Sequence, residues 1–181
     1  YDFTDSFGVF GTAAYNENLP WLDDLGNSFI DQSEKARTYE VGVSYDGFDV
    51  FSEGDTLKAK LTYFDTSIWD GTTYSGIDDV ELDGFELEAS YASSAFYVDF
   101  NASQARGIVT EGAGRRAVTP GSFFSYTAAD TVQLTVGKKF LDEQLDTSFE
   151  VTHAFAHDRT TSTTGARAPS EAYTVVDASL G

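Results

Sequence analysis

Apolar and polar residues alternate with a period of two over most of this 181-residue chain. The clearest segment, residues 37–46, reads RTYEVGVSYD and places tyrosine and valine at odd positions and polar or small residues at even ones. Successive side chains of a β-strand point to opposite faces, so this pattern predicts a strand with one apolar and one polar face. Seven other segments behave alike: 6–16, 56–68, 85–91, 96–103, 131–136, 148–155 and 176–180. The sequence therefore predicts an all-β protein of about eight strands, several near the ~9–11 residues of a tilted membrane strand.

One change of parity interrupts this pattern. Val80 and Leu82 occupy even positions, whereas Phe85 and Leu87 occupy odd positions. The dipeptide Asp83-Gly84 stands between the two pairs, and glycine is the residue that tolerates a β-bulge best. The sequence therefore predicts a bulge at Asp83-Gly84 that returns the apolar side chains to one face.

The predicted connections alternate between long and short along the chain. The long, polar connections are residues 17–36, 69–79, 107–130 and 158–172, and the short ones are 46–55, 91–95 and 140–144. All three prolines fall in the long connections, where no ladder N–H is lost. Long loops on one side and short turns on the other are the arrangement of outer-membrane β-barrels.

A soluble β-sandwich is the alternative, since alternation alone fits both architectures. However, aromatic residues such as Tyr39, Tyr45, Trp69 and Phe96 recur at predicted strand ends, as girdles at two water–lipid interfaces require. The strands also exceed the ~5–6 residues usual in globular sheets. The polar face holds charges that suit a wet lumen: Glu40, Lys58, Lys60, Glu86, Glu88, Asp99 and Glu150. We therefore favour an antiparallel transmembrane β-barrel, in which pairing would set Lys60 near Glu88.

Composition narrows the function classes. The chain has 30 Asp and Glu against 11 Lys and Arg, a formal charge of −19, and no Cys or Met. No basic stripe is present to neutralise phosphates, which argues against a nucleic-acid partner. The sequence has no Cys, no GxSxG motif and no glycine-rich phosphate loop, so we expect neither enzymatic activity nor a bound cofactor. The chain lacks an initial Met and a signal peptide and ends in strand-like sequence, so we expect it to be part of a longer protein.

The remaining candidate chemistry concerns histidines and acidic pairs. His153 and His157 are four residues apart, and on a strand they would lie ~13 Å apart, too far to share a metal ion. We expect them at the membrane interface near lipid headgroups. The acidic pairs Asp23-Asp24, Asp78-Asp79 and Asp65/Asp70 fit solvated loops, with divalent cation binding as the alternative. No metal site is predicted.

Four segments together resemble the TonB-dependent receptors. Residues 33–43, SEKARTYEVGV, are similar to that family's PEKSxxYELGL strand, and residues 57–70, LKAKLTYFDTSIWD, to its LxLxxAYFxTDIxD strand. Residues 82–88, LDGFELE, match xxGxELE, and residues 173–181, YTVVDASLG, are similar to a late YxxxDLxxGY strand. These segments occur in the family's order across nearly the whole chain.

The resemblance implies that residues 1–181 are part of a barrel of about 22 strands with a plugged lumen, and that the plug and the final strands lie outside this chain. It implies a place in the bacterial cell outer membrane and active uptake of an iron compound, haem or a ferric siderophore. The expected partners are outer-membrane lipid, the receptor's own plug domain, the TonB complex, and the iron chelate or haem. A passive porin-like channel or an adhesin barrel is the alternative function.

Substrate contact is expected on the long loops. In the haem-receptor subfamily, the loop before the PEKS strand carries an FRAP motif, a haem-ligating His and an NPNL motif. Here residues 17–20, ENLP, keep only the proline, and no His follows in this loop. Tyr15 could replace the ligand, and loop arginines could meet an anionic ferric chelate. The candidate substrate-binding residues are Tyr15, Trp21, Arg115, Arg116 and Arg159.

Overall fold

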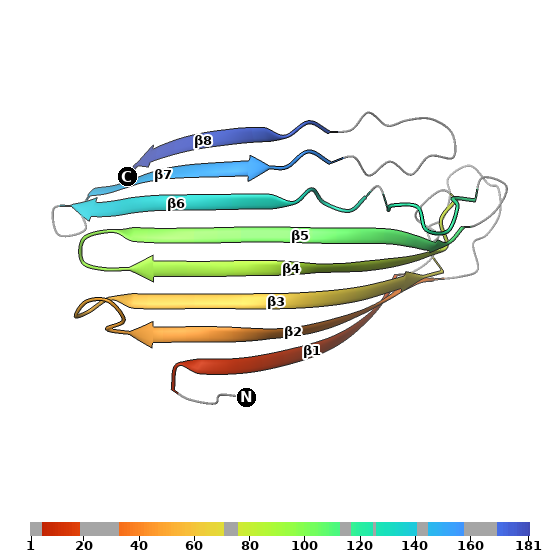
Figure 1. The fold of residues 1–181 in the computed structure, drawn as a ribbon, viewed down its shortest axis with the longest axis horizontal. Helices are drawn as coiled ribbons and strands as arrows, with labels where there is room; N and C mark the ends of the chain where they lie inside the picture. The colour runs from red at the N-terminus through yellow and green to blue at the C-terminus, as the bar shows by residue number, and fades with distance from the viewer. Residues whose placement is uncertain are drawn as a thin grey trace.

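The computed structural model describes residues 5–18, 33–70, 76–112, 117–124, 126–140, 145–157 and 170–181. These residues form one antiparallel eight-stranded sheet, in which the strands follow one another in chain order (Figure 1). The strands are β1 (Phe7–Asn18), β2 (Glu34–Phe48), β3 (Thr56–Trp69), β4 (Asp79–Ala92), β5 (Tyr97–Glu111), β6 (Thr131–Phe140), β7 (Leu145–Ala154) and β8 (Tyr173–Leu180). The predicted all-β fold with about eight strands is confirmed. No helix in the described segments is long and apolar enough to cross a membrane.

The connections alternate as the sequence predicts. The strand ends that short connections join, those of β2 and β3, β4 and β5, and β6 and β7, lie at one end of the sheet, and the strand ends that long connections join lie at the other (Figure 1). The first seven strands have 10 to 15 residues and β8 has eight. We call the two ends the turn end and the loop end.

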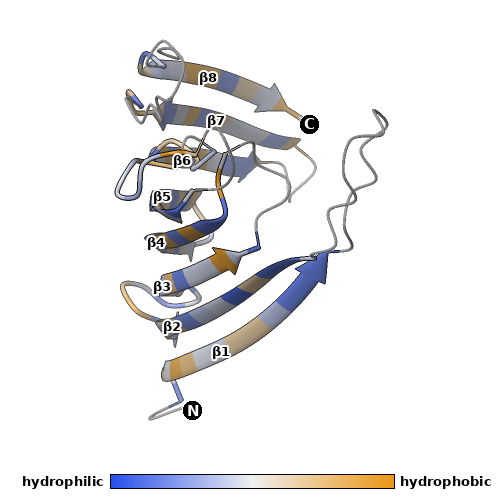
Figure 2. Ribbon diagram, turned by 90° about the vertical axis from the view of Figure 1, so that its right-hand side faces the viewer, coloured by the Kyte–Doolittle hydropathy of each residue, from blue (hydrophilic) through white to orange (hydrophobic). Residues whose placement is uncertain are grey.

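The pairing register assigns every strand residue to one of two faces. Val43 pairs with Leu61 on one face, and the next pair along, Ser44 with Lys60, lies on the other. The first, the apolar face, leaves large side chains 41–57% exposed: Tyr39, Val41, Val43, Leu61, Phe85, Leu134, Val136, Phe149 and Val176. The sheet is curved, and its strands show alternating hydropathy (Figure 2). These side chains come from six strands, and so extended an exposed apolar surface exceeds what water-soluble monomers show, so this face requires an apolar environment.

Aromatic pairs border the apolar face at both ends. At the turn end, the ring centroids of Phe7 and Tyr45 lie 5.4 Å apart, and Tyr91 lies 5.5 Å from Phe96. At the loop end, the ring of Tyr15 lies 6.1 Å from that of Trp69. Aromatic side chains gather in this way at the two water–lipid interfaces of a membrane barrel.

The predicted bulge at Asp83-Gly84 is wrong. The register between β3 and β4 runs unbroken through this point, with Asp65 opposite Asp83. The irregularity in β4 lies between Asp79 and Val80 instead, in its pairing with β5. Val80 and Leu82 therefore face the polar side of the sheet. They are accommodated there because a later segment of the chain covers them.

That covering segment, residues 117–124, we call the strap. Its backbone extends the sheet beside β5: the Val109 N–H donates to Ser122 O and the Phe124 N–H to Gly107 O, both at 2.8 Å. The strap buries a small core on the polar face, made of Ile77, Val80, Val109, Val118 and Phe124, with Ile68 and Leu82 packed against it. β5 thus reaches Glu111, and part of the predicted loop 107–130 is paired to the sheet.

A buried carboxylate organises the β2–β3 turn. Asp55 has no exposed surface and accepts hydrogen bonds from the backbone N–H groups of Val50, Phe51 and Ser52 and from the Tyr91 hydroxyl. Burial alone would raise the pKa of Asp55, but the hydrogen bonds outweigh it and leave this pKa below its usual value. The turn is therefore held by an ionised group.

Candidate functional site

The polar face of the sheet is the candidate site, because a large group of carboxylates lies on it and three cavities open along it. All seven charged residues predicted for this face lie on it, as the register shows: Glu40, Lys58, Lys60, Glu86, Glu88, Asp99 and Glu150. Asp46, Asp146 and Asp177 occupy the same face. Carboxylates thus greatly outnumber cations here, and the face is acidic.

The lysines neutralise little of this charge. Lys58 makes a 3.1 Å ion pair with Asp46, but both side chains are nearly two-thirds exposed, so the pair adds little stability. Lys60 lies directly opposite Glu88, as predicted, yet its ammonium group sits 5.1 Å from the centre of the Phe10 ring. The cation is therefore directed toward β1 rather than toward the acidic centre of the face.

Threonine hydroxyl groups, which are uncharged, donate hydrogen bonds to two of these carboxylates. Thr12 donates its hydroxyl hydrogen to Glu40 at 2.8 Å, and Thr135 donates to Glu150 at 3.2 Å. A hydroxyl donor brings no positive charge to the carboxylate that it binds. The polar face thus offers fixed negative charge and free acceptor capacity to whatever lies against it.

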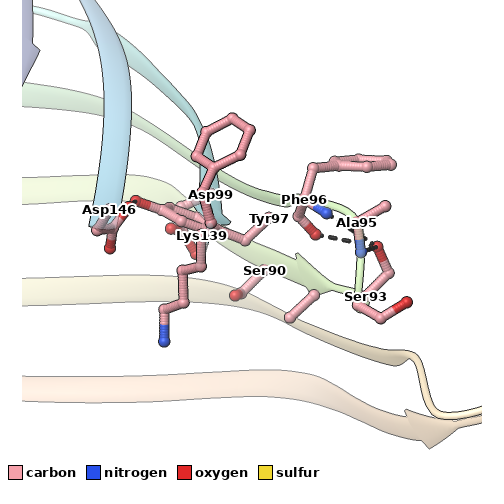
Figure 3. A pocket seen from close by; sticks show the side chains of 11 residues that line it. Ser90, Ser93, Ala95, Phe96, Tyr97, Asp99, Lys139 and Asp146 are labelled. Atoms are coloured by element: carbon pink, nitrogen blue, oxygen red, sulfur yellow. Dashed lines mark hydrogen bonds between the residues drawn. The ribbon is translucent and has the colours of Figure 1, made fainter. Parts of the chain in front are cut away.

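Three shallow cavities follow one another along this face. The one at the turn end has a volume of about 610 Å³ and is lined by Ser90, Tyr97, Asp99, Lys139 and Asp146, among others (Figure 3). The next, about 530 Å³, shares Ser90 and Asp99 with it, and a third, about 350 Å³, continues past Glu88 and Asn101. Together they form a continuous polar groove across β2 to β7.

The turn-end cavity is shaped by two local hydrogen-bonded units. The Tyr97 hydroxyl donates to Asp146 at 3.0 Å, which connects β5 to β7 across β6. The Ser93 hydroxyl closes the β4–β5 turn by bonding Phe96 O at 3.1 Å, as Figure 3 shows. These contacts give the groove a defined wall at its turn end.

Aromatic rings lie over glycines at three places on the polar face. The pairs Phe10–Gly42, Phe64–Gly84 and Tyr97–Gly137 are direct cross-strand partners. A Cβ atom on any of these glycines would overlap the ring of its partner. Glycine is required at these sites because the ring occupies the space of a side chain.

Of the five predicted substrate-binding residues, Tyr15 alone lies in the part of the chain that the structure describes. Trp21, Arg115, Arg116 and Arg159 lie outside the described residues. Tyr15 lies on the apolar face, 57% exposed and beside Trp69. Its role as a substrate contact stays a prediction, but its ring points away from the polar groove.

The histidines and acidic pairs take separate places. His153 lies on the apolar face, where Nδ1 is 2.9 Å from the Thr174 hydroxyl, and His157 pairs with Ser170 in a backbone bridge. Asp23-Asp24 lies outside the described residues. Burial and the neighbouring charges of Asp79 and Asp70 raise the pKa of Asp78. Within the described segments, no three His, Cys, Asp or Glu side chains are placed to hold a metal ion.

Sequence reasoning missed the glycines that receive rings and the apolar residues of the strap. A signal was available for the first group, since Gly42, Gly84 and Gly137 each stand at a polar-face position within a strand pattern. Val118 and Phe124 gave no local signal, because a segment between two strands reveals its packing partner only in three dimensions.

A long-stranded antiparallel sheet with one bare apolar face, one polar face and alternating short and long connections defines the wall of a membrane β-barrel. The chain belongs to the TonB dependent receptor-like, beta-barrel family, whose model matches residues 1–181. No curated protein matches the sequence, so the family model carries the assignment. Members of this family are transport receptors rather than enzymes, and their barrels lie in the outer membrane of Gram-negative bacteria.

Proposed function

We propose that this chain forms part of the wall of an outer-membrane receptor that takes up an iron compound, haem or a ferric siderophore, by TonB-dependent transport. The observation that carries the receptor part of this proposal is the acidic, grooved polar face within a sheet of this family. A surface with fixed charge and free acceptors suits an internal polar partner, for which the receptor's own plug domain is our candidate. The TonB complex would act through that plug.

The sheet would be one arc of a larger barrel of about 22 strands. Among the described strands, β1 and β8 each pair on one side only. An unpaired strand edge cannot face hydrocarbon, because no water is present to satisfy its N–H and C=O groups. Further strands beside both edges would remove this problem, and residues 1–181 would then be a partial barrel domain.

An iron compound is supported by the long connections rather than by the groove. Ferric chelates and haem carry negatively charged oxygen groups, which the acidic groove would repel. Arg115, Arg116 and Arg159 belong to the connections at the loop end and could bind such groups in bidentate fashion. We therefore propose that the substrate first contacts these connections, and that Trp21 and Tyr15 contribute to the same contact.

The test is uptake of radioactive iron by cells that express the full-length receptor. We expect the protein to fractionate with outer membrane, to shift mobility on boiling, and to transport haem or a ferric siderophore only while the proton motive force is intact. Replacing Arg115, Arg116 and Arg159 together with Ala should weaken binding strongly. The matched control is Arg106→Ala, since Arg106 lies on the apolar face over the Phe123 ring and should leave binding unchanged.

Uptake that continues after the proton motive force is collapsed would favour a passive channel and overturn the receptor proposal. Outer-membrane location without binding of any iron compound would favour an adhesin barrel. Recovery of the protein as a compact soluble monomer would overturn the membrane assignment itself.

A further inference from the structure

The cavity at the turn end of the polar face has an aromatic floor. The Tyr97 side chain crosses from β5 to β6, where the tip of its ring occupies the space that a side chain at Gly137 would take. Its hydroxyl group donates to Asp146 on β7, so the side chain is fixed at its far end as well. The ring therefore lies along the sheet and turns one face toward the cavity that it lines (Figure 3). A ring held in this way loses little conformational entropy when a ligand packs on it.

The polar groups around this floor are mixed in character. The register places Ser90 opposite Asp99, and Lys139 opposite Asp146, and all four side chains line the cavity. Ser94, in the turn between β4 and β5, is exposed at the rim. A carboxylate oxygen accepts more than one hydrogen bond, an ammonium group donates up to three, and a hydroxyl group does both. The cavity thus offers acceptors, donors and hydroxyl groups within one small volume.

This mixture discriminates between classes of ligand. A simple anion would meet Asp99 and Asp146, and a simple cation would meet Lys139. An apolar ligand would take these charged groups out of water without replacing their hydrogen bonds. A sugar ring has a C–H face that matches the negative face of the Tyr97 ring, and hydroxyl groups around its rim that donate and accept hydrogen bonds. The cavity volume of about 610 Å³ lies within the range of about 300–1,000 Å³ that is usual for small-molecule sites.

We infer that the turn-end cavity binds a neutral pyranose ring, which stacks on Tyr97 and forms hydrogen bonds to Asp99, Lys139 and Ser90. This site goes beyond the proposed function, because the connections that would contact the iron compound lie at the other end of the strands. In outer-membrane barrels the turn end is the periplasmic side. Two sources supply a pyranose ring there, a glycan of the periplasm and a solute that crosses the lumen, and both present the same chemistry to the cavity.

The test is saturation-transfer NMR on the purified full-length receptor, in a detergent without sugar groups. The probes are glucose, glucosamine and glucuronate, which share one ring and differ in charge. We expect the strongest saturation on the C–H groups of glucose, because neither charged ring suits a cavity that holds both carboxylates and an ammonium group. Stronger binding of either charged ring would overturn the inference.

Substitution of the floor separates stacking from a general effect on the sheet. Tyr97→Leu should weaken glucose binding about tenfold. The matched control is Phe64→Leu, since the Phe64 ring lies over Gly84 in the same manner but does not line this cavity. Tyr97→Phe keeps the stacking face and gives up only the hydrogen bond to Asp146, so it should retain most of the affinity. Equal loss in Tyr97→Leu and Phe64→Leu would contradict stacking on Tyr97.

The source of the sugar is identified in cells by photocrosslinking. The photoreactive p-benzoylphenylalanine replaces Ser94 on the cavity rim. Adducts that lysozyme shortens come from the periplasmic glycan, and adducts that appear only when maltotriose is supplied in the medium come from a solute in transit. Absence of both adducts would contradict occupation of the cavity in cells.

Every variant is first required to fractionate with outer membrane and shift mobility on boiling. Should Tyr97→Leu fail this check, Ser90→Phe, which fills the cavity from β4, takes its place and should abolish glucose binding. Absence of a glucose signal from the unsubstituted receptor would show that the plug or another part of the protein covers the cavity, and would overturn the inference. Iron uptake is measured separately, so its failure contradicts the proposed function and leaves the sugar site standing or falling on the NMR result.

Discussion

The turn end and the loop end of the sheet are stabilised by opposite means. At the turn end, the Asp55 carboxylate gathers three backbone N–H groups and a tyrosine hydroxyl. At the loop end, the strap packs Val118 and Phe124 against Val80 and Val109 on the polar face. A seven-residue turn is too short to bury apolar side chains, whereas a long connection can fold back over the sheet.

This difference predicts opposite responses to two perturbations. Removing apolar volume should affect the loop end and spare the turn end, because only the strap depends on packing. Lowering the pH should loosen the turn end, which depends on the ionised Asp55 carboxylate, and should not loosen the strap core, which is apolar. Amide hydrogen exchange on the full-length receptor can follow both ends in one experiment.

Phe124→Ala should have the largest effect. The side chain is 3% exposed, and truncation of a buried phenylalanine costs about 3–5 kcal/mol. We expect the amides of Val109 and Phe124 to lose protection while those of the β2–β3 turn keep theirs. The matched control is Phe123→Ala, because the neighbouring ring is 40% exposed on the apolar face. Equal loss of protection in both variants would contradict the strap core.

Gly107→Ala should loosen the same end by adding volume. A Cβ atom there would overlap the Thr127 hydroxyl and come within 2.9 Å of Phe124 Cβ. Overpacking of this kind costs about 1–3 kcal/mol, which should appear as faster exchange in the strap. In Gly11→Ala, the nearest contact of the new atom is 3.5 Å, so this variant should exchange as the unsubstituted receptor does.

Acid should loosen the turn end. The pKa of Asp55 is lowered on folding, so its contribution is fully present above its usual value of about 3.8 and is lost as pH falls through the lower, folded pKa. The amides of Val50, Phe51 and Ser52 should therefore exchange faster in strong acid, after correction for intrinsic rates. Asp55→Asn should show that faster exchange already at neutral pH. Unchanged exchange in Asp55→Asn would show that the charge is dispensable.

Asp78→Asn should have the smallest effect, and a favourable one. The pKa of Asp78 is raised by burial and by Asp79 and Asp70, so ionisation of this group weakens the folded loop end as pH rises. Removing the charge should raise thermal stability slightly at neutral pH and leave it unchanged in acid. The measurement is the temperature to which the sample must be heated before the receptor loses the gel mobility of its compact form. If Asp78→Asn instead lowered thermal stability at neutral pH, the predicted direction of the change would be wrong.

The strands were predictable because parity is a local property of the sequence. Alternation in residues 37–46 assigns each side chain to a face without knowledge of its neighbours, and pairing confirmed Lys60 opposite Glu88. The parity shared by Phe7, Val9 and Tyr15 could likewise have placed Tyr15 on the apolar face. Parity assigned Val80 and Leu82 wrongly, because the strap that covers them on the polar face comes more than thirty residues later in the chain. Apolar residues on a polar face then resemble a break in register.

The rings that lie over Gly42, Gly84 and Gly137 bear on how such a chain can diversify. Each ring joins two strands whose connection is long, namely β1–β2, β3–β4 and β5–β6. A tight turn fixes the register of its hairpin, but a long connection cannot, so the ring and the glycine supply that alignment within the strands. The loops between these strands therefore do not have to set the register of the strands that they join. Their sequence and length can change with the substrate they meet, while the wall beneath keeps its alignment.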